Sequence, residues 1–88
     1  MSVSASEVES ALRAALAPES LEVVDDSASH AGHAGAREGR HFNVAICSAR
    51  FEGLTRVARH RLVYDALQTL MPRGIHAVAI DARAPGLR

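Results

Sequence analysis

The interpretation of this sequence depends on two stretches, Arg59-His60-Arg61-Leu62-Val63-Tyr64 and Ile75-His76-Ala77-Val78-Ala79-Ile80. The first belongs to a predicted helix that Thr55 caps and that continues to about Leu70. The second is an apolar run and predicts a strand, with Gly74 as the break between the two elements. A long helix followed directly by a buried strand therefore ends the predicted fold.

The long helix is expected to bury an apolar stripe on one side and to carry positive charge on another. The stripe consists of Leu54, Ala58, Leu62, Ala66 and Leu70, widened by Val57 and Leu67. Arg56, Arg59 and His60 share a face at spacing i, i+3 and i+4, and Arg61 lies next to them. This charged face could contact phosphates or an acidic partner, although such faces are usually the solvated back of a helix.

A shorter helix is predicted at the other end of the chain, from Ser4 to Leu16. Apolar residues recur within it at helical spacing. Ser4 or Ser6 is expected to cap its first turn, and Glu7 or Glu9 is the matching acidic partner of a capping box.

Two strands are predicted between the helices, at 21–24 and 42–47. Residues 25–40 separate them and are small, polar and rich in glycine, which indicates a long loop. The order of elements is therefore α-β-β-α-β, with room for a one-turn helix before the long one. A chain of 88 residues is expected to form one domain, residues 1–88.

Composition excludes several classes of function. Ten arginines balance ten acidic residues, so no net charge draws the chain toward nucleic acid. The single cysteine, Cys47, excludes an internal disulfide and favours the reducing cytoplasm. No segment is apolar for long enough to span a membrane. No motif pairs a nucleophile with a base, so we expect no catalytic residues and no enzyme.

Histidines are the remaining candidates for chemistry. His30 and His33 form an H-x-x-H pair in the predicted loop, and His76 opens the last strand. Neutral imidazole is a common metal ligand, yet taken alone such residues are more often solvated or internally bonded histidines. A zinc site of these three with Cys47 is conceivable, but it lacks the C-x-x-C pair of a structural site.

Along almost its whole length the sequence resembles the BolA family. The matching stretches are Leu21–Ser27, the histidine loop, His41–Val44, Phe51–Gly53, Arg59–Tyr64 and Ile75–Ile80. The resemblance implies an α+β fold of the class II KH-like type, a three-stranded mixed sheet with helices on one face. Gly32-His33-Ala34-Gly35 matches the G-x-x-G of KH domains, but it lies between predicted strands rather than helices, so RNA binding does not follow.

The resemblance also implies a function. BolA proteins pair with monothiol glutaredoxins that carry a C-G-F-S site, and the two proteins share a [2Fe–2S] cluster with glutathione. His76 matches the family's ligand at the start of the last strand, and His30 matches the loop ligand, with His33 as its competitor. The chain would thus be of the histidine-loop type. It would hold no cluster stably alone, and by itself it would be a monomer or a weak homodimer.

A second role is also attributed to some BolA proteins, namely DNA-binding transcriptional regulation in the stress response and cell morphology. The Arg-rich helix, with Arg56, Arg59, His60 and Arg61, would then bind DNA or the partner protein. The zero net charge predicts that any affinity for DNA is weak. The adaptor role in iron–sulfur trafficking or in iron and redox sensing is therefore the first hypothesis.

Overall fold

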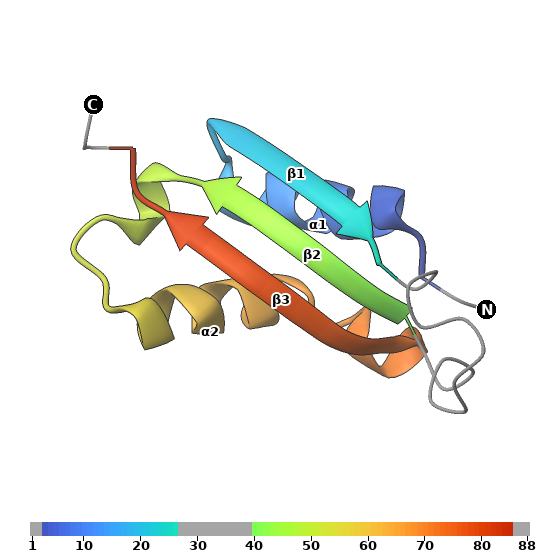
Figure 1. Ribbon diagram of the computed structural model, residues 1–88. Helices are drawn as coiled ribbons and strands as arrows, with labels where there is room; N and C mark the ends of the chain where they lie inside the picture. The colour runs from blue at the N-terminus through green and yellow to red at the C-terminus, as the bar shows by residue number, and fades with distance from the viewer. Residues whose placement is uncertain (1–2, 27–39, 86–88) are drawn as a thin grey trace.

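A computed structural model describes residues 3–26 and 40–85 of the protein (Figure 1). Its order of helices and strands is α-β-β-α-β, as predicted. The helices are α1 (Ala5–Leu16) and α2 (Arg56–Ala66), the strands are β1 (Ser20–Asp25), β2 (Arg40–Cys47) and β3 (Ile75–Arg83), and the single 3₁₀ turns are η3 (Ala49–Phe51) and η4 (Met71–Arg73). The turn η3 is the one-turn helix expected before the long helix.

The three strands form one mixed sheet in the order β1-β2-β3. The central strand β2 is antiparallel to β1 and parallel to β3, so the chain must cross over between β2 and β3. That crossover contains α2, and Figure 1 shows α1 and α2 behind the same face of the sheet. One face of the sheet is therefore covered by helices and the other is open, as predicted for this fold class.

The core lies between the sheet and the two helices. Alternate residues of β2, namely Phe42, Val44 and Ile46, point into it and are at most 2% exposed. The residues that meet them from the helices and turns are Val8, Leu12, Leu16, Phe51, Val63, Leu67 and Leu70. Burial of each large apolar side chain contributes about 1.5–3 kcal/mol, so this layer stabilises the fold.

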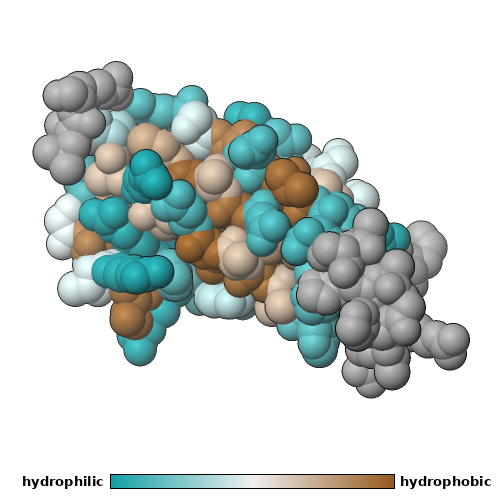
Figure 2. Space-filling view, viewed as in Figure 1, coloured by the Kyte–Doolittle hydropathy of each residue, from teal (hydrophilic) through white to brown (hydrophobic). Residues whose placement is uncertain are grey.

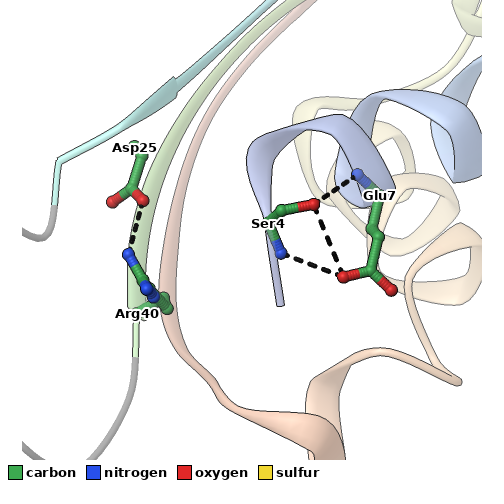
Figure 3. Close-up of polar contacts among 4 residues, drawn as sticks. All are labelled: Ser4, Glu7, Asp25 and Arg40. Atoms are coloured by element: carbon green, nitrogen blue, oxygen red, sulfur yellow. Dashed lines mark hydrogen bonds and ion pairs between the residues drawn. The ribbon is translucent and has the colours of Figure 1, made fainter. Parts of the chain in front are cut away.

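The first turn of α1 confirms the predicted capping box and selects Ser4 and Glu7 from the candidates. The Ser4 hydroxyl accepts a hydrogen bond from the Glu7 N–H at 3.1 Å, and the Ser4 N–H donates to the Glu7 carboxylate at 3.1 Å (Figure 3). Glu9 instead forms an ion pair with Arg13 at 3.0 Å, one turn further along the helix. Ser6 does not cap this helix.

The predicted boundary of the long helix was wrong at its C-terminal end. Helix α2 ends at Ala66 rather than at about Leu70, and turns connect it to η4. Beyond Ala66, backbone bonds appear that span three residues instead of four, from the Gln68 N–H to the Asp65 carbonyl and from the Leu70 N–H to the Leu67 carbonyl. This tighter turn geometry lets the chain reverse toward β3.

The predicted apolar stripe was also partly wrong. Val57 is 63% exposed, whereas Val63, which was left out of the stripe, is fully buried. Arg59, Val63 and Leu67 follow one another at a spacing of four residues and so share one side of α2. That side faces the sheet: Val63 and Leu67 are fully buried, and the Arg59 guanidinium donates to the carbonyl of Ala82 in β3 at 3.2 Å.

Candidate functional site

His76 lies at the end of the sheet where β3 begins. The residue before it, Ile75, is buried and anchors the strand in the core, while His76 itself is exposed. Gly74 makes the turn into the strand with φ 140° and ψ 9°, a conformation that side chains disfavour. The Gly74-Ile75-His76 sequence thus combines a sharp turn, a buried anchor and a solvent-facing imidazole.

A second imidazole lies beside His76. Arg40 pairs with Ile75 and His41 pairs with Ala77, so His76 is the extra residue of a β-bulge. The bulge leaves the rings of His41 and His76 with centroids 5.0 Å apart and planes tilted by 46°. Sequence analysis did not single out His41, because only the parallel pairing of β2 with β3 brings residues so far apart in the chain together.

Three polar contacts fix this end of the sheet. The N–H of Arg40 donates to the carbonyl of Gly74 at 2.7 Å, and the N–H of Asp26 donates to the carbonyl of His41 at 2.7 Å. The Arg40 guanidinium also forms an ion pair with Asp25 at 2.8 Å, which joins the end of β1 to the start of β2 (Figure 3). The backbone around the two histidines is therefore held from both neighbouring strands.

His30 and His33, the predicted loop ligands, lie outside the described residues, as does the Gly32–Gly35 motif. The residues that bracket them are described. Asp26 and Arg40 both lie at the end of the sheet that carries His76, because they bond to His41 and Gly74 respectively. The chain therefore enters and leaves the segment 27–39 next to the histidine pair.

Cys47 lies at the other end of the sheet. It pairs with Arg83 at the end of β3, whereas His76 lies beside His41. The stretch of β2 between His41 and Cys47 spans about 20 Å at about 3.3 Å per residue. The zinc site that would combine Cys47 with His76 is thereby excluded. Among residues 3–26 and 40–85, no group of three histidine, cysteine or acidic residues could hold a metal ion.

The Arg-rich helix presents its charges in two different settings. Arg56, Arg59 and His60 lie together over a hollow of about 380 Å³ between α2 and the second half of β3, and Arg61 is exposed elsewhere. The Arg59 guanidinium donates to the carbonyls of Leu54 and Ala82, at 3.1 and 3.2 Å, so it also braces the fold. Arg56 and Arg61 are the more accessible cations of the set.

The open face of the sheet is mixed in character. Figure 2 shows brown apolar side chains gathered over the strands between teal polar ones. A shallow hollow of about 280 Å³ crosses all three strands and is lined mainly by Val24, Asn43, Ala45 and Ala79, with Glu22 and Asp81 at its margin. The carboxylate of Asp81 pairs with Arg83 at 3.0 Å, and this contact raises the pKa of the arginine.

No helix in the described part of the chain is both long and apolar enough to cross a membrane.

Comparison with known proteins identifies relatives over nearly the whole chain. The family model described as BolA-like protein matches residues 12–86. BolA-like protein 1 of Mus musculus is 46% identical over 88 residues, which cover 96% of this chain and 63% of the mouse protein. The DNA-binding transcriptional regulator BolA of Escherichia coli is 41% identical over 73 residues, covering 83% of this chain and 68% of that protein. The chain thus spans less than two thirds of the mouse relative.

The fold is also shared with solved structures. The BolA domain of SufE1 from Arabidopsis thaliana superposes with a TM-score of 0.81 at 44% identity and covers 92% of this chain and 91% of that one.

Proposed function

Because this chain belongs to the BolA-like protein family, we propose that it is a non-enzymatic adaptor that shares a [2Fe–2S] cluster with a monothiol glutaredoxin. The observation that carries the proposal is the exposed imidazole of His76, fixed at the end of the sheet. It has a second imidazole next to it, and the described residues offer no third ligand to complete a metal site. Such an arrangement suits a half-site that a partner completes.

The chemistry of the ligands supports a site in which this chain supplies imidazoles and the partner supplies thiolates. Iron–sulfur clusters require soft thiolate ligands, and the single cysteine of this chain lies about 20 Å from His76 along the sheet. A partner must therefore supply the thiolates, and we assign them to the glutaredoxin cysteine and to bound glutathione. Histidine ligation on one iron raises the reduction potential relative to an all-cysteine site.

We assign the second ligand from this chain to His30, with His33 as its competitor. The chain link from Asp26 to His30 can span at most about 14 Å when fully extended. Since the backbone N–H of Asp26 bonds to the carbonyl of His41, that reach includes the neighbourhood of His76. The assignment gives two imidazoles on one iron and two thiolates on the other.

Docking of the glutaredoxin would add contacts outside the cluster. Arg56, His60 and Arg61 on α2 are the candidates for them, because Arg59 is already engaged with two backbone carbonyls. The adaptor would act in iron–sulfur trafficking or in iron and redox sensing, in a reducing cytoplasm. Alone, the chain would hold no cluster stably.

Co-expression with the host's monothiol glutaredoxin, followed by visible absorption of the purified complex, tests the proposal. We expect a mixed complex whose spectrum differs from that of the glutaredoxin homodimer. His76→Ala should return the spectrum to that of the homodimer while the far-ultraviolet circular dichroism stays unchanged. Gln68→Ala, at an exposed position after α2, is the matched control and should leave the mixed spectrum intact. A mixed spectrum that survives His76→Ala would contradict the proposal.

A second candidate function is DNA binding, which the similarity to the Escherichia coli regulator favours. Arg56 and Arg61 would bind phosphates, since both are exposed on α2. We expect weak, sequence-independent binding whose salt dependence decreases by about one unit when one phosphate-binding arginine is replaced. Titration of a duplex with the wild type, Arg56→Ala and Arg61→Ala at several salt concentrations tests it. Tight binding that does not depend on salt would place this role first.

A further inference from the structure

The imidazole of His41 lies beside His76, and the cluster proposal does not assign it as a ligand. We propose that the two residues chelate a single divalent first-row transition-metal ion in the chain alone, as a site with open coordination positions. The proposal does not depend on the glutaredoxin or on the cluster. It concerns a mononuclear ion, bound by two residues that the β-bulge places side by side.

The distance between the rings fits one shared ion. A tetrahedral Zn²⁺ ion lies about 2.0–2.1 Å from each imidazole nitrogen, and the ring centre lies roughly 1.2 Å further away. Two imidazoles on one such ion therefore have ring centres about 5.2 Å apart. The ring centres of His41 and His76 are 5.0 Å apart, so their separation matches that of two imidazoles bound to one ion.

The backbone under both residues is already fixed. His41 lies in the central strand, which is hydrogen-bonded to β1 and β3, and its own carbonyl accepts the N–H of Asp26. His76 follows the buried Ile75, and Gly74 before it accepts the N–H of Arg40. Because the backbone is fixed, only the two side chains have to be ordered when the ion binds, which favours chelation.

The donor set defines the class of ion. Imidazole nitrogens suit Zn²⁺, Cu²⁺ or Ni²⁺ and disfavour Ca²⁺ and Mg²⁺, which prefer oxygen. Among the described residues no third histidine, cysteine or acid joins the pair. Water or a ligand from outside the chain must fill the remaining positions, as in metal sites that bind exogenous groups.

The test is a calorimetric titration of the full chain with Zn²⁺ alone, followed by NMR of the histidine ring nitrogens. We expect one equivalent of Zn²⁺ and selective shifts of the His41 and His76 rings. His41→Ala and His76→Ala should each weaken binding at least tenfold, because even outer-shell changes at metal sites cost about 10–100-fold. His60→Ala, which removes an imidazole beside the second half of β3, should not weaken it.

Two results would overturn the proposal. One is wild-type affinity in His41→Ala or in His76→Ala. The other is binding that disappears in the double variant His30→Ala/His33→Ala while the rings of His41 and His76 stay unshifted in the wild type. If His41→Ala unfolds, as circular dichroism would show, His41→Asn and His76→Ala decide the question. His41→Ala separates this proposal from the one on the glutaredoxin, because it should lose Zn²⁺ binding and still share the cluster.

Discussion

The two faces of the sheet differ in burial: helices cover one face, and the other is open to solvent. On the covered face, Phe42, Val44 and Ile46 of β2 are almost completely buried against the helices. On the open face, the residues between them, including Asn43 and Ala45, are exposed, and near the start of the strand His41 lies beside His76. One strand therefore contributes alternately to stability and to the candidate chemistry.

This difference predicts which substitutions affect which property. Changes on the covered face should lower the free energy of unfolding and affect binding only through loss of the fold. Changes at the end of the open face should alter metal or partner binding with little effect on stability, because substitutions at exposed sites usually change stability by less than about 0.5 kcal/mol.

The largest expected effect is at Phe51, which is fully buried in the core. Phe51→Ala should cost about 3–5 kcal/mol through lost burial and the cavity that remains. A small domain has a total stability of about 5–15 kcal/mol, so much of the chain should unfold at moderate urea concentrations. Urea unfolding followed by circular dichroism measures this. Ala45→Ser, on the open face, is the control and should change stability by less than about 0.5 kcal/mol. An equal loss of stability in both variants would contradict the claim that only the covered face stabilises the fold.

The second-largest effect on stability is expected at Gly74, the residue of the turn that connects η4 to β3 and its His76. Its φ of 140° is strained for any other residue, so Gly74→Ala should cost about 1–3 kcal/mol. The matched control is Gly53→Ala, since Gly53 also has positive φ, at 75°, with no neighbouring atom in the way of a methyl group. Both variants should lose stability, but only Gly74→Ala should also weaken Zn²⁺ binding by displacing His76. Urea unfolding measures the stability of the two variants, and calorimetric titration measures their affinity for Zn²⁺. Equal Zn²⁺ affinity in the two variants would mean that the turn does not position His76.

The smallest effect is the pH dependence of the α1 cap. The Ser4 N–H, and then the Arg73 guanidinium, hold the pKa of the Glu7 carboxyl below its usual value of 4.5. Because the pKa is lower in the folded state, this stabilisation is fully present above about pH 4.5 and is lost as the pH falls through the folded-state pKa. Glu7→Gln should therefore be less stable than the wild type at neutral pH, and the difference should shrink in acid. Urea midpoints measured from pH 7 to pH 3 check this; a difference that stays constant across the range would show that the charge of Glu7 plays no part.

Most of the fold could be predicted from sequence because local signals agreed with one another. Capping residues, alternating apolar residues in β2 and the break at Gly74 each fixed an element, and the structure confirms the resulting order. The errors arose where tertiary contacts decided the outcome. The side of α2 that faces the sheet depends on contacts with other elements, such as the bond from Arg59 to Ala82, so the burial of Val63 did not follow from the helix sequence alone.

The candidate site was predictable only in part, for the same reason. His76 could be identified from the resemblance and from its place after Gly74. His41 could not, because its proximity to His76 depends on the register of two parallel strands and on a bulge between them. His30 and His33 remain predictions, since they lie outside the described residues.

The central claim is that imidazoles of this chain bind a cluster shared with a glutaredoxin. The most direct measurement is pulsed electron paramagnetic resonance of the reduced mixed complex, prepared with ¹⁵N-histidine in this chain and unlabelled glutaredoxin. Two ¹⁵N couplings of directly bound imidazole are predicted for the wild type. Both should be missing in His76→Ala, because only the cluster of the unlabelled glutaredoxin homodimer then remains. A mixed complex that contains the cluster but shows no ¹⁵N coupling from this chain would contradict the account.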